Sequence, residues 1–276
     1  MSRPSTSISP ALRGRAVARF ARLVDGLLRR ALSTLQFVGD ASAVFVRGID
    51  PGNWRRTMRD EFNRFFYQAG IRAIPAVIVV ALLVGMGLVV QVLYWLSLVG
   101  QEGSIGGFLV MMLVRQIAPV VTVLIVIGRS GSVLLDEVGQ FKVDGQIRML
   151  ESNGIDPTDF IAVPRCFSMA LATFMLTMIF LYVALWSGFI AASLAGLTVI
   201  SLSEFVDGVL SNMTLGDNLL LLIKPLVTGF VVAYIAIWLG LRVEPSVLAV
   251  RQVFPRAFVY SILAVFAIGV AVSAVL

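Results

Sequence analysis

The 276-residue sequence contains no histidine and a single cysteine, Cys166. Histidine is the commonest metal ligand and general base in proteins, and one cysteine cannot form an intramolecular disulfide. Charged residues are also scarce, at 14% of the chain. These absences disfavour a metal site, a Cys/His nucleophile and a disulfide-stabilised secreted domain, so we do not expect catalysis on this chain.

Sequence motifs for common chemistries are missing as well. The chain has neither a G-x-x-x-x-G-K-[ST] phosphate-binding loop nor a G-x-S-x-G nucleophile motif, so it is not expected to bind ATP itself. Asp136 and Glu137 are adjacent carboxylates, but neighbouring residues on a helix point about 100° apart and no third acid or histidine lies near them. We therefore predict no catalytic residue, no metal site and no cofactor on this chain.

Apolar residues, in contrast, make up 58% of the chain and give a mean hydropathy of +0.93. A soluble domain of this length does not need such long uncharged runs. The predicted fold class is all-α integral membrane, with five transmembrane helices. We expect a disordered N-terminus over 1–10, basic amphipathic interfacial helices over 11–70 and a membrane-embedded domain over 71–276.

Five long apolar runs predict the transmembrane helices, because about 20 apolar residues cross a hydrocarbon core of about 30 Å. The run from Cys166 to Ser203 carries no charge and exceeds the length of one span. We therefore expect one span to about Leu194 and then a partly embedded stretch, with a re-entrant piece within 195–217 as one alternative. The predicted spans are 74–99, 108–127, 166–194, 218–241 and 257–276.

Before the first span the chain is basic and amphipathic. Between Ala11 and Leu35 arginines lie near one helical face and apolar residues near the other, which predicts a helix on an anionic leaflet, with a solvated tail as the alternative. After an expected loop at 48–52, a second short helix should lie in the headgroup layer, because aromatic residues face away from its arginines. Its aromatic and apolar residues are Trp54, Met58, Phe62 and Phe65.

The positions of the basic residues predict the orientation. The net charge is +6, and 13 of the 22 lysines and arginines precede Ile74, while the loops predicted on the opposite side have none. One of these loops is expected to be acidic, because it holds Glu204, Asp207 and Asp217. Basic residues concentrate on the cytoplasmic side of membrane proteins. We therefore predict a cytoplasmic N-terminus and a periplasmic C-terminus, and the charge indicates orientation in a membrane and not nucleic-acid binding.

A polar segment, Gly128–Pro157, separates the second and third predicted spans. We expect a sharp turn at Gly128–Gly131 and a helix stop at Gly154 and Asp156-Pro157. Between them, apolar residues recur at helical spacing among charged ones, which predicts one or two short amphipathic helices on the water side. The segment is either a solvated loop helix or a coupling helix through which a transport permease contacts a separate ATPase.

Several short motifs in this segment and in the spans distinguish these alternatives. From Gly128 onward the order is Gly-Arg-x-Gly-Ser, Glu137-x-Gly139, Lys142-Val143, Gln146-Ile147, Leu150 and Gly154-x-Asp156-Pro157. The chain resembles the MlaE/YrbE family of ABC-transporter permeases over about Phe37 to the C-terminus. The spans carry the rest of the resemblance: Pro75, Gly85-Met86 and Gln91; Arg115-Gln116-x-x-Pro119-Val120; Pro164-Arg165; and Leu222-Ile223-Lys224.

The resemblance implies a homodimeric permease in the bacterial inner membrane, part of an ATP-driven transporter that moves phospholipid or a related lipid across or between envelope membranes. It implies three partners: a cytoplasmic ABC ATPase dimer that holds the ATP and Mg, a periplasmic MCE-domain protein and a small cytoplasmic STAS-type regulator. The coupling segment would be 128–165. The residues implied to couple to the ATPase are Glu137, Gly139, Lys142, Gln146, Ile147, Leu150 and Glu151.

Two cations lie inside predicted spans, Arg115 before Pro119 and Lys224 before Pro225. A charged residue at mid-bilayer costs roughly 2.5–3.5 kcal/mol, so each needs a compensating contact. Proline frees a backbone carbonyl, and interrupted spans of this kind often mark binding sites. We predict that Arg115 and Lys224 face a shared cavity and bind an anionic headgroup beside Gln91 and Gln116; snorkelling to the headgroup layer is the alternative.

The chain departs from the family pattern at several positions. Family members commonly have an acid at Gln116, and some have one near Gly269, so Arg115 is expected to be less neutralised here. Gly-rich sequence is absent between Arg242 and Arg256, which we expect to form a basic loop. The departures on the face expected to meet the ATPase are Asp136, Gly145, Arg148 and Met149.

Two other function classes fit a polytopic membrane protein. An integral-membrane lipid-modifying enzyme is disfavoured by the absence of histidine and of clustered acids. A membrane scaffold without transport activity would not need a coupling helix. Co-purification with an ATPase would separate the transporter from both.

Overall fold

The computed structural model describes residues 36–49, 54, 56–100, 105–196 and 201–275. Every regular element in these ranges is helical, which confirms the all-α fold class. The chain divides into two units, Met1–Val46 and Arg47–Leu276. In the first unit residues 36–46 are helical, and the predicted disordered segment 1–10 and helix 11–35 lie outside the described residues. Residues 48–49 are helical where a loop was predicted, and the remainder of that loop is also outside.

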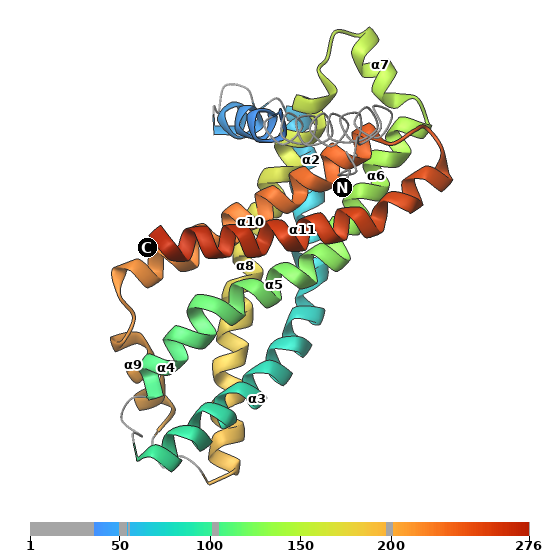
Figure 1. Cartoon of the computed structure of the whole chain (residues 1–276). Helices are drawn as coiled ribbons and strands as arrows, with labels where there is room; N and C mark the ends of the chain where they lie inside the picture. The colour runs from blue at the N-terminus through green and yellow to red at the C-terminus, as the bar shows by residue number, and fades with distance from the viewer. Residues whose placement is uncertain (1–35, 50–53, 55, 101–104, 197–200, 276) are drawn as a thin grey trace, which may run out of the picture. The chain divides into compact units, whose positions relative to one another are not determined.

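Five helices in the described part of the second unit are long and apolar enough to cross a membrane, which confirms the predicted number of spans. They follow α2 (Arg56–Ala69), the predicted second interfacial helix, which one 3₁₀ turn joins to the first span. Figure 1 shows their arrangement. The spans are α3 (Ile74–Val99); α4 (Ile105–Leu109) with the π-helix η4 (Val110–Ile117) and α5 (Ala118–Val126); α8 (Pro157–Leu194); α10 (Leu215–Arg242); and α11 (Val247–Val275).

The second span does not end in the turn predicted at Gly128–Gly131. A second π-helical segment, η5 (Ile127–Gly131), joins α5 to α6 (Ser132–Val143), so the helix continues from the apolar run into the polar segment. The backbone of Gly131 has an ordinary helical φ of −65°. The prediction of a turn was wrong because glycine permits a turn without requiring one. As a result, the second span and the first half of the polar segment form one helix.

The chain turns after α6, where Gly145 adopts a φ of +73°, a left-handed conformation that favours glycine. The short helix α7 (Gln146–Ser152) follows, so the polar segment contains two helices. The predicted stop is confirmed: Gly154 has a φ of +71°, and the Asp156 carboxylate accepts a hydrogen bond from the Thr158 N–H at 2.9 Å as the N-cap of α8. This cap starts α8 at Pro157, so the third helix is longer than the predicted span 166–194.

Charged residues near span ends caused two further errors of the sequence prediction. Arg251 and Arg256 lie on α11 and not in a loop, because an apolar span can extend as a helix beyond the membrane core. Asp217 lies in the first turn of α10, where it forms a capping box with Thr214, and not in an acidic loop. The predicted acidic loop instead contains α9 (Leu202–Ser211); whether 195–217 enters the membrane stays a prediction.

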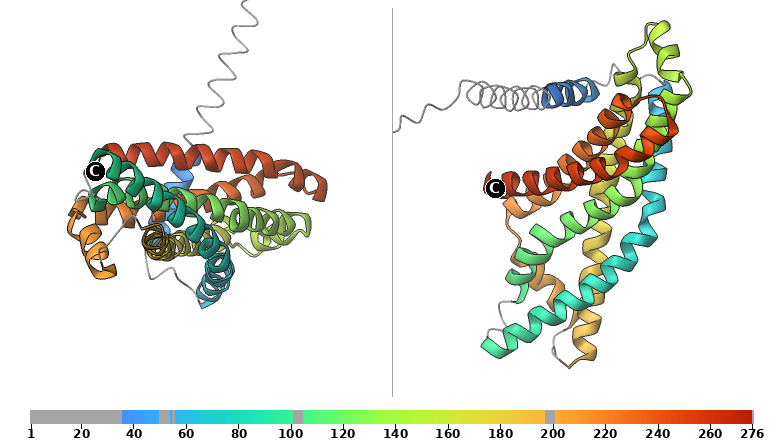
Figure 2. Two further views of the ribbon diagram at one scale, coloured as in Figure 1. Left: turned by 90° about the horizontal axis from the view of Figure 1, so that it is seen from below. Right: turned by 45° about the vertical axis from the view of Figure 1, so that its right-hand side comes forward.

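Within the second unit, α10 lies at the centre and α11 at the periphery. The most apolar window of α10 is 72% buried, against 17% for α11. Figures 1 and 2 show α8 passing beside α3 and α10, with α7 at one end of the unit and α4 and α9 together at the other. The polar segment is therefore held at the end of the helices that is opposite to α4 and α9.

Glycines allow α3 and α8 to approach closely, as small residues do in membrane helix pairs. A Cβ atom added at Gly85 would lie 2.3 Å from the Ala184 carbonyl oxygen, and one at Gly188 would lie 2.2 Å from a methyl carbon of Val89. Gly87, two residues along α3, has no such neighbour within 4 Å. Ordinary helix packing accounts for Gly85 but not for Gly87.

We predict opposite outcomes for two alanine substitutions in α3. Gly85→Ala should lower the free energy of unfolding by about 2 kcal/mol, because the backbone of α8 cannot move aside as a side chain can. Gly87→Ala is the matched control and should leave stability unchanged or raise it slightly, since alanine favours helix. Thermal unfolding of the purified chain in detergent measures both. Equal unfolding temperatures for the two variants would contradict the close α3–α8 contact.

Candidate functional site

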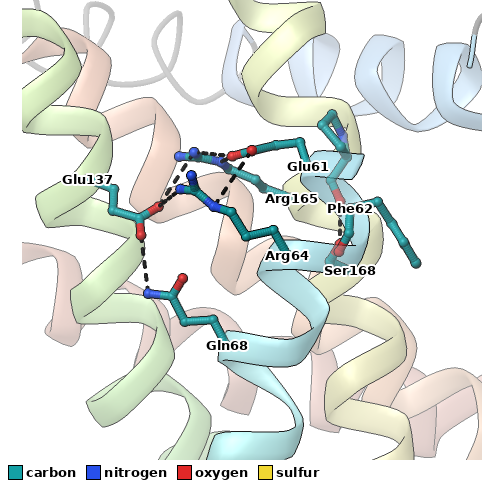
Figure 3. Close-up of polar contacts among 8 residues, drawn as sticks. Glu61, Phe62, Arg64, Gln68, Glu137, Arg165 and Ser168 are labelled. Atoms are coloured by element: carbon teal, nitrogen blue, oxygen red, sulfur yellow. Dashed lines mark hydrogen bonds and ion pairs between the residues drawn. The ribbon is translucent and has the colours of Figure 1, made fainter. Parts of the chain in front are cut away.

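The first candidate site joins the polar segment to the rest of the fold. It lies where α6 meets α2 and the first turns of α8, near the α7 end of the unit (Figure 1). Figure 3 shows side chains from these three helices pointing toward one another. We call the group of Glu61, Arg64, Gln68, Glu137 and Arg165 the charge cluster.

Arg165, on α8, is the centre of the charge cluster. Its side chain is only 1% exposed, and its Nε and Nη2 atoms donate to Oε1 of Glu61 on α2 at 3.1 and 2.5 Å. The same Nη2 lies 3.5 Å from Oε2 of Glu137 on α6 (Figure 3). A buried guanidinium is stable only when carboxylates balance its charge, and here two helices each supply one.

Glu137 has two further contacts, both with α2. Its Oε1 accepts a hydrogen bond from Gln68 Nε2 at 3.1 Å, and its Oε2 lies 3.8 Å from Arg64 Nη2. Arg64 also lies 3.8 Å from Glu61, so two guanidinium groups face two carboxylates (Figure 3). The cluster is electrically balanced, and it connects α6 to both α2 and α8.

Aromatic rings and a hydroxyl group support the charge cluster. The guanidinium carbon of Arg165 lies 5.0 Å from the ring centre of Phe141 and 5.9 Å from that of Phe65, within the range of cation–π attraction. One turn along α8, Ser168 Oγ donates to the Phe62 carbonyl oxygen of α2 at 2.8 Å. These contacts fix Arg165 between α2 and α6.

The residues predicted to couple to an ATPase divide into two groups. Glu137, Gly139 and Lys142 on α6 contact other parts of this chain: Gly139 packs where a Cβ would lie 2.7 Å from a Val250 methyl carbon of α11, and Lys142 Nζ donates to the Leu241 carbonyl oxygen at 2.5 Å. Lys142 thereby satisfies a free carbonyl at the C-terminal end of α10. Their contacts join α6 to α2, α8, α10 and α11.

The α7 residues form the second group and are oriented differently. Gln146 and Glu151 are exposed, while Ile147 and Leu150 are half-buried. Met149, one of the departures from the family pattern, is 68% exposed, and Arg148 is exposed beside it. The exposed surface of α7 is therefore centred on Arg148 and Met149 and flanked by Gln146 and Glu151.

A cavity of about 460 Å³ lies beneath α7 and beside the charge cluster. Apolar side chains line most of it, and Arg165, Arg64 and Glu61 form its charged part. Helix α7 contacts α6 and, to a smaller extent, α8, and the cavity lies among these helices and α2. Its lining residues from the polar segment are Phe141, Gln146, Ile147, Met149, Leu150 and Asn153.

Four members of the charge cluster were not predicted as site residues: Glu61, Arg64, Gln68 and Arg165. The contact between Glu61 and Arg165 joins residues 104 positions apart, a pairing that one sequence does not reveal. One signal was present, because Arg165 directly precedes a long uncharged run, and an arginine in such a position needs an acidic partner. Of its two acidic partners, Glu137 was assigned to ATPase coupling and Glu61 was assigned no role.

The second candidate site surrounds Lys224 on α10. Its side chain is buried, and Nζ donates to the Arg115 carbonyl oxygen at 2.8 Å and to Gln116 Oε1 at 3.0 Å, with Ser273 Oγ at 3.5 Å. The Arg115 carbonyl lacks its usual helical donor because Pro119, four residues later, has no N–H. Lys224 therefore fills the gap in the backbone hydrogen bonding that Pro119 creates.

The backbone of Arg115 contacts Lys224, but the Arg115 side chain forms its ion pair with another residue. Its Nε atom pairs with Oδ1 of Asp217, whose side chain is fully buried, while the Arg115 side chain remains 43% exposed. The expectation that Arg115 is less neutralised was wrong, because Asp217, which was predicted to lie in a loop, supplies a carboxylate. Arg115 also belongs to η4, and π-helical segments occur often at functional sites.

The predicted substrate residues are thus only partly brought together. Lys224 contacts Gln116 and the backbone of Arg115. Gln91 is exposed on α3, and none of the hydrogen bonds described around Lys224 includes it. Gln116 is exposed and half-exposed Arg115 lies beside it, so a ligand headgroup approaching from that surface would meet these two before Lys224.

Comparison with known proteins gives one family. The family described as Permease MlaE matches residues 62–275. A probable ABC transporter permease protein of Synechocystis sp. is 31% identical over 212 residues, covering 77% of this chain and 78% of that protein. The intermembrane phospholipid transport system permease protein MlaE of Haemophilus influenzae is 26% identical and covers 75% and 79%. The chloroplastic protein TRIGALACTOSYLDIACYLGLYCEROL 1 of Arabidopsis thaliana is 26% identical and covers 78% and 59%.

Proposed function

Since this chain belongs to the MlaE permease family, we propose that it is the membrane subunit of an ATP-driven transporter of phospholipid or a related lipid. The family resemblance read from the sequence is confirmed, and the chain is a multi-pass ABC-transporter permease with five apolar helices. As a permease subunit it is not itself the catalyst. The lipid substrate and the use of ATP belong to the proposal.

The observation that carries the proposal is the continuous helix from α5 through η5 to α6. A helix transmits a push along its axis more directly than a flexible loop does, so a force that passes from α7 to α6 would reach the second span without a further turn. Helix α7 itself exposes one face to solvent and borders the cavity with another, as expected of a docking element. The same span carries Arg115 and Gln116 at its other end, which gives a mechanical path to the lipid site.

The proposed arrangement follows from this path. An ABC ATPase dimer docks on α7 from the cytoplasm, with ATP and Mg held entirely in the ATPase. The permease works as a homodimer in the inner membrane, with a cytoplasmic N-terminus and a periplasmic C-terminus. An MCE-domain protein meets it on the periplasmic side, and a STAS-type regulator joins on the cytoplasmic side. The basic residues of α2 support this orientation, because they favour the cytoplasmic interface.

The lipid would be recognised at Arg115, Gln116 and Lys224. In the structure Asp217 pairs with Arg115, so an anionic headgroup would compete with Asp217 for the guanidinium. Such competition allows a ligand to bind and to leave again, which a transporter requires. Gln91, exposed on α3, is proposed to contact the lipid as a neutral group.

We expect the tagged chain, expressed in its native host and purified in mild detergent, to co-purify with an ATPase. Met149→Asp should reduce the recovered ATPase about tenfold, because a charge replaces a large apolar side chain at the centre of the exposed α7 surface. The chain should still insert, since the change lies outside the apolar spans. Ser152→Asp on the same helix is the control and should recover the wild-type amount. Purification without any ATPase would contradict the proposed function.

A further inference from the structure

The charge cluster contains two buried polar atoms that lack a hydrogen-bond partner. They are Nη1 of Arg165 and Oε2 of Glu137. One is a cationic donor and the other an anionic acceptor, and they belong to residues already 3.5 Å apart through Arg165 Nη2. Buried polar groups are almost always hydrogen-bonded, so a donor and an acceptor of opposite charge that both lack a hydrogen bond within one cluster need an explanation.

The explanation lies in how the Arg165 guanidinium is divided between two carboxylates. Glu61 receives both hydrogen bonds, from Nε and Nη2, while Glu137 has only an ion pair with no hydrogen bond to Arg165. A small approach of α6 toward α8 would let Glu137 accept from Arg165 and satisfy the two unpaired atoms. The structure thus holds one of two available pairings of a shared guanidinium.

We propose that Arg165 is a positioning residue that exchanges Glu61 for Glu137 as its hydrogen-bonding partner when α6 moves during transport. This inference rests on the proposed function, because the ATPase acting on α7 would supply the movement. Pairing with Glu61 holds α8 to α2 and leaves α6 without a hydrogen bond from Arg165 to α8, although Gln68 and Arg64 still connect α6 to α2. Pairing with Glu137 locks α8 to α6, so that the second and third spans move together.

Three features of the surroundings permit this exchange. Arg165 lines the cavity of about 460 Å³ beneath α7, which gives the polar segment room to shift. Glu61 would not be left without a partner, because Arg64 already lies 3.8 Å from it. Gln68 holds Glu137 through its other oxygen, Oε1, and so leaves Oε2 available to Arg165. Each carboxylate therefore has a second contact that compensates when Arg165 turns away.

The exchange predicts that substitutions of Glu61 and of Glu137 change the rate of ATP hydrolysis in opposite directions. Glu61→Gln weakens the resting pairing and should favour the α6-locked state, because a population shifts toward the state whose competitor is weakened. Glu137→Gln weakens the α6-locked state. A purely structural salt bridge would give losses of the same sign for both variants.

The test uses the complete complex of permease and ATPase in phospholipid nanodiscs, with ATP hydrolysis measured in the absence of acceptor protein. We expect Glu61→Gln to raise the hydrolysis rate and Glu137→Gln to lower it, each by about tenfold, within the range typical of coupling between sites. In proteoliposomes, Arg165→Lys should lower the lipid moved per ATP by a similar factor, because lysine keeps the charge but lacks the planar fork that reaches both carboxylates. Asp60→Asn, an exposed acid beside Glu61, is the matched control and should change nothing.

Changes of the same sign in both glutamine variants, or no change in either, would overturn the exchange while leaving the proposed function intact. Absence of an ATPase from the complex would instead contradict the proposed function itself. If a glutamine variant does not assemble, Glu61→Asp and Glu137→Asp shorten the reach but keep the charge. They should show the same opposite signs, and matching signs in this pair would again overturn the exchange.

Discussion

Glu137→Lys should abolish lipid transport while the chain still inserts into the membrane. The new ammonium would face Arg165 and Arg64, which now lie 3.5 and 3.8 Å from the Glu137 carboxylate. Reversing the charge of a partner in a largely buried cluster costs about 3 kcal/mol or more, so α6 would separate from α2 and α8. An added positive charge in a cytoplasmic segment agrees with the positive-inside rule and should not disturb insertion.

Lipid transfer by the reconstituted complex and the amount of chain in the membrane fraction measure the two halves of this prediction. The milder Glu137→Gln keeps the side-chain shape and the hydrogen-bonding partner Gln68, so it should retain insertion and assembly. Transport at the wild-type rate in Glu137→Lys would contradict a role for α6 in transmitting force. Loss of the chain from the membrane would show that the cluster is needed for folding instead.

Lys224→Ala should lower the amount of lipid that co-purifies with the chain by roughly tenfold. The substitution removes a buried ammonium that donates to Arg115, Gln116 and Ser273, and it leaves the Arg115 carbonyl without a donor next to Pro119. An unsatisfied buried carbonyl costs about 1–3 kcal/mol, so the η4 segment that carries Arg115 should lose its position. Mass spectrometry of lipids extracted from the purified chain measures the effect.

A second variant separates the charge of Lys224 from its volume. Lys224→Met keeps a long unbranched side chain and should preserve packing while it removes the ammonium. We expect it to lose lipid as Lys224→Ala does, but to unfold at a higher temperature. Unchanged lipid in both variants would leave Lys224 with a structural role only and would remove it from the lipid site.

The spans could be predicted well from the sequence because each depends on a local property. Uncharged runs of sufficient length gave the number of spans, and the first span ends at Val99 as predicted. The stop at Gly154 and Asp156 was equally local, since it needs only one left-handed glycine and one N-cap side chain. Such features do not depend on residues far away in the chain.

Errors arose where a residue type allows more than one structure. Gly128 and Gly131 permit a turn, but the chain continues as a helix there, so the second span and α6 are joined. Arg251 and Arg256 mark the water-facing end of a span, and the sequence does not show whether that end is a loop or a helix. Asp217 was assigned to a loop for the same reason, and its pairing with Arg115 was missed.

Several residues of the candidate sites were predicted from the sequence, but the contacts between them were not. Arg115, Gln116 and Lys224 were identified because charge in a span is costly, and the structure brings them together through Lys224. Glu137 was identified in a resemblance motif, but its contacts with Arg64, Gln68 and Arg165 depend on the packing of α2, α6 and α8. Packing between distant segments is the information that a single sequence lacks.

The proposed function requires that an ATPase acts on the surface of α7. A photo-crosslinking amino acid placed at Met149, the most exposed large apolar residue of α7, tests it directly in living cells. We expect one dominant crosslink, to a cytoplasmic nucleotide-binding subunit. A crosslink to a periplasmic protein, or none to any nucleotide-binding protein, would contradict it.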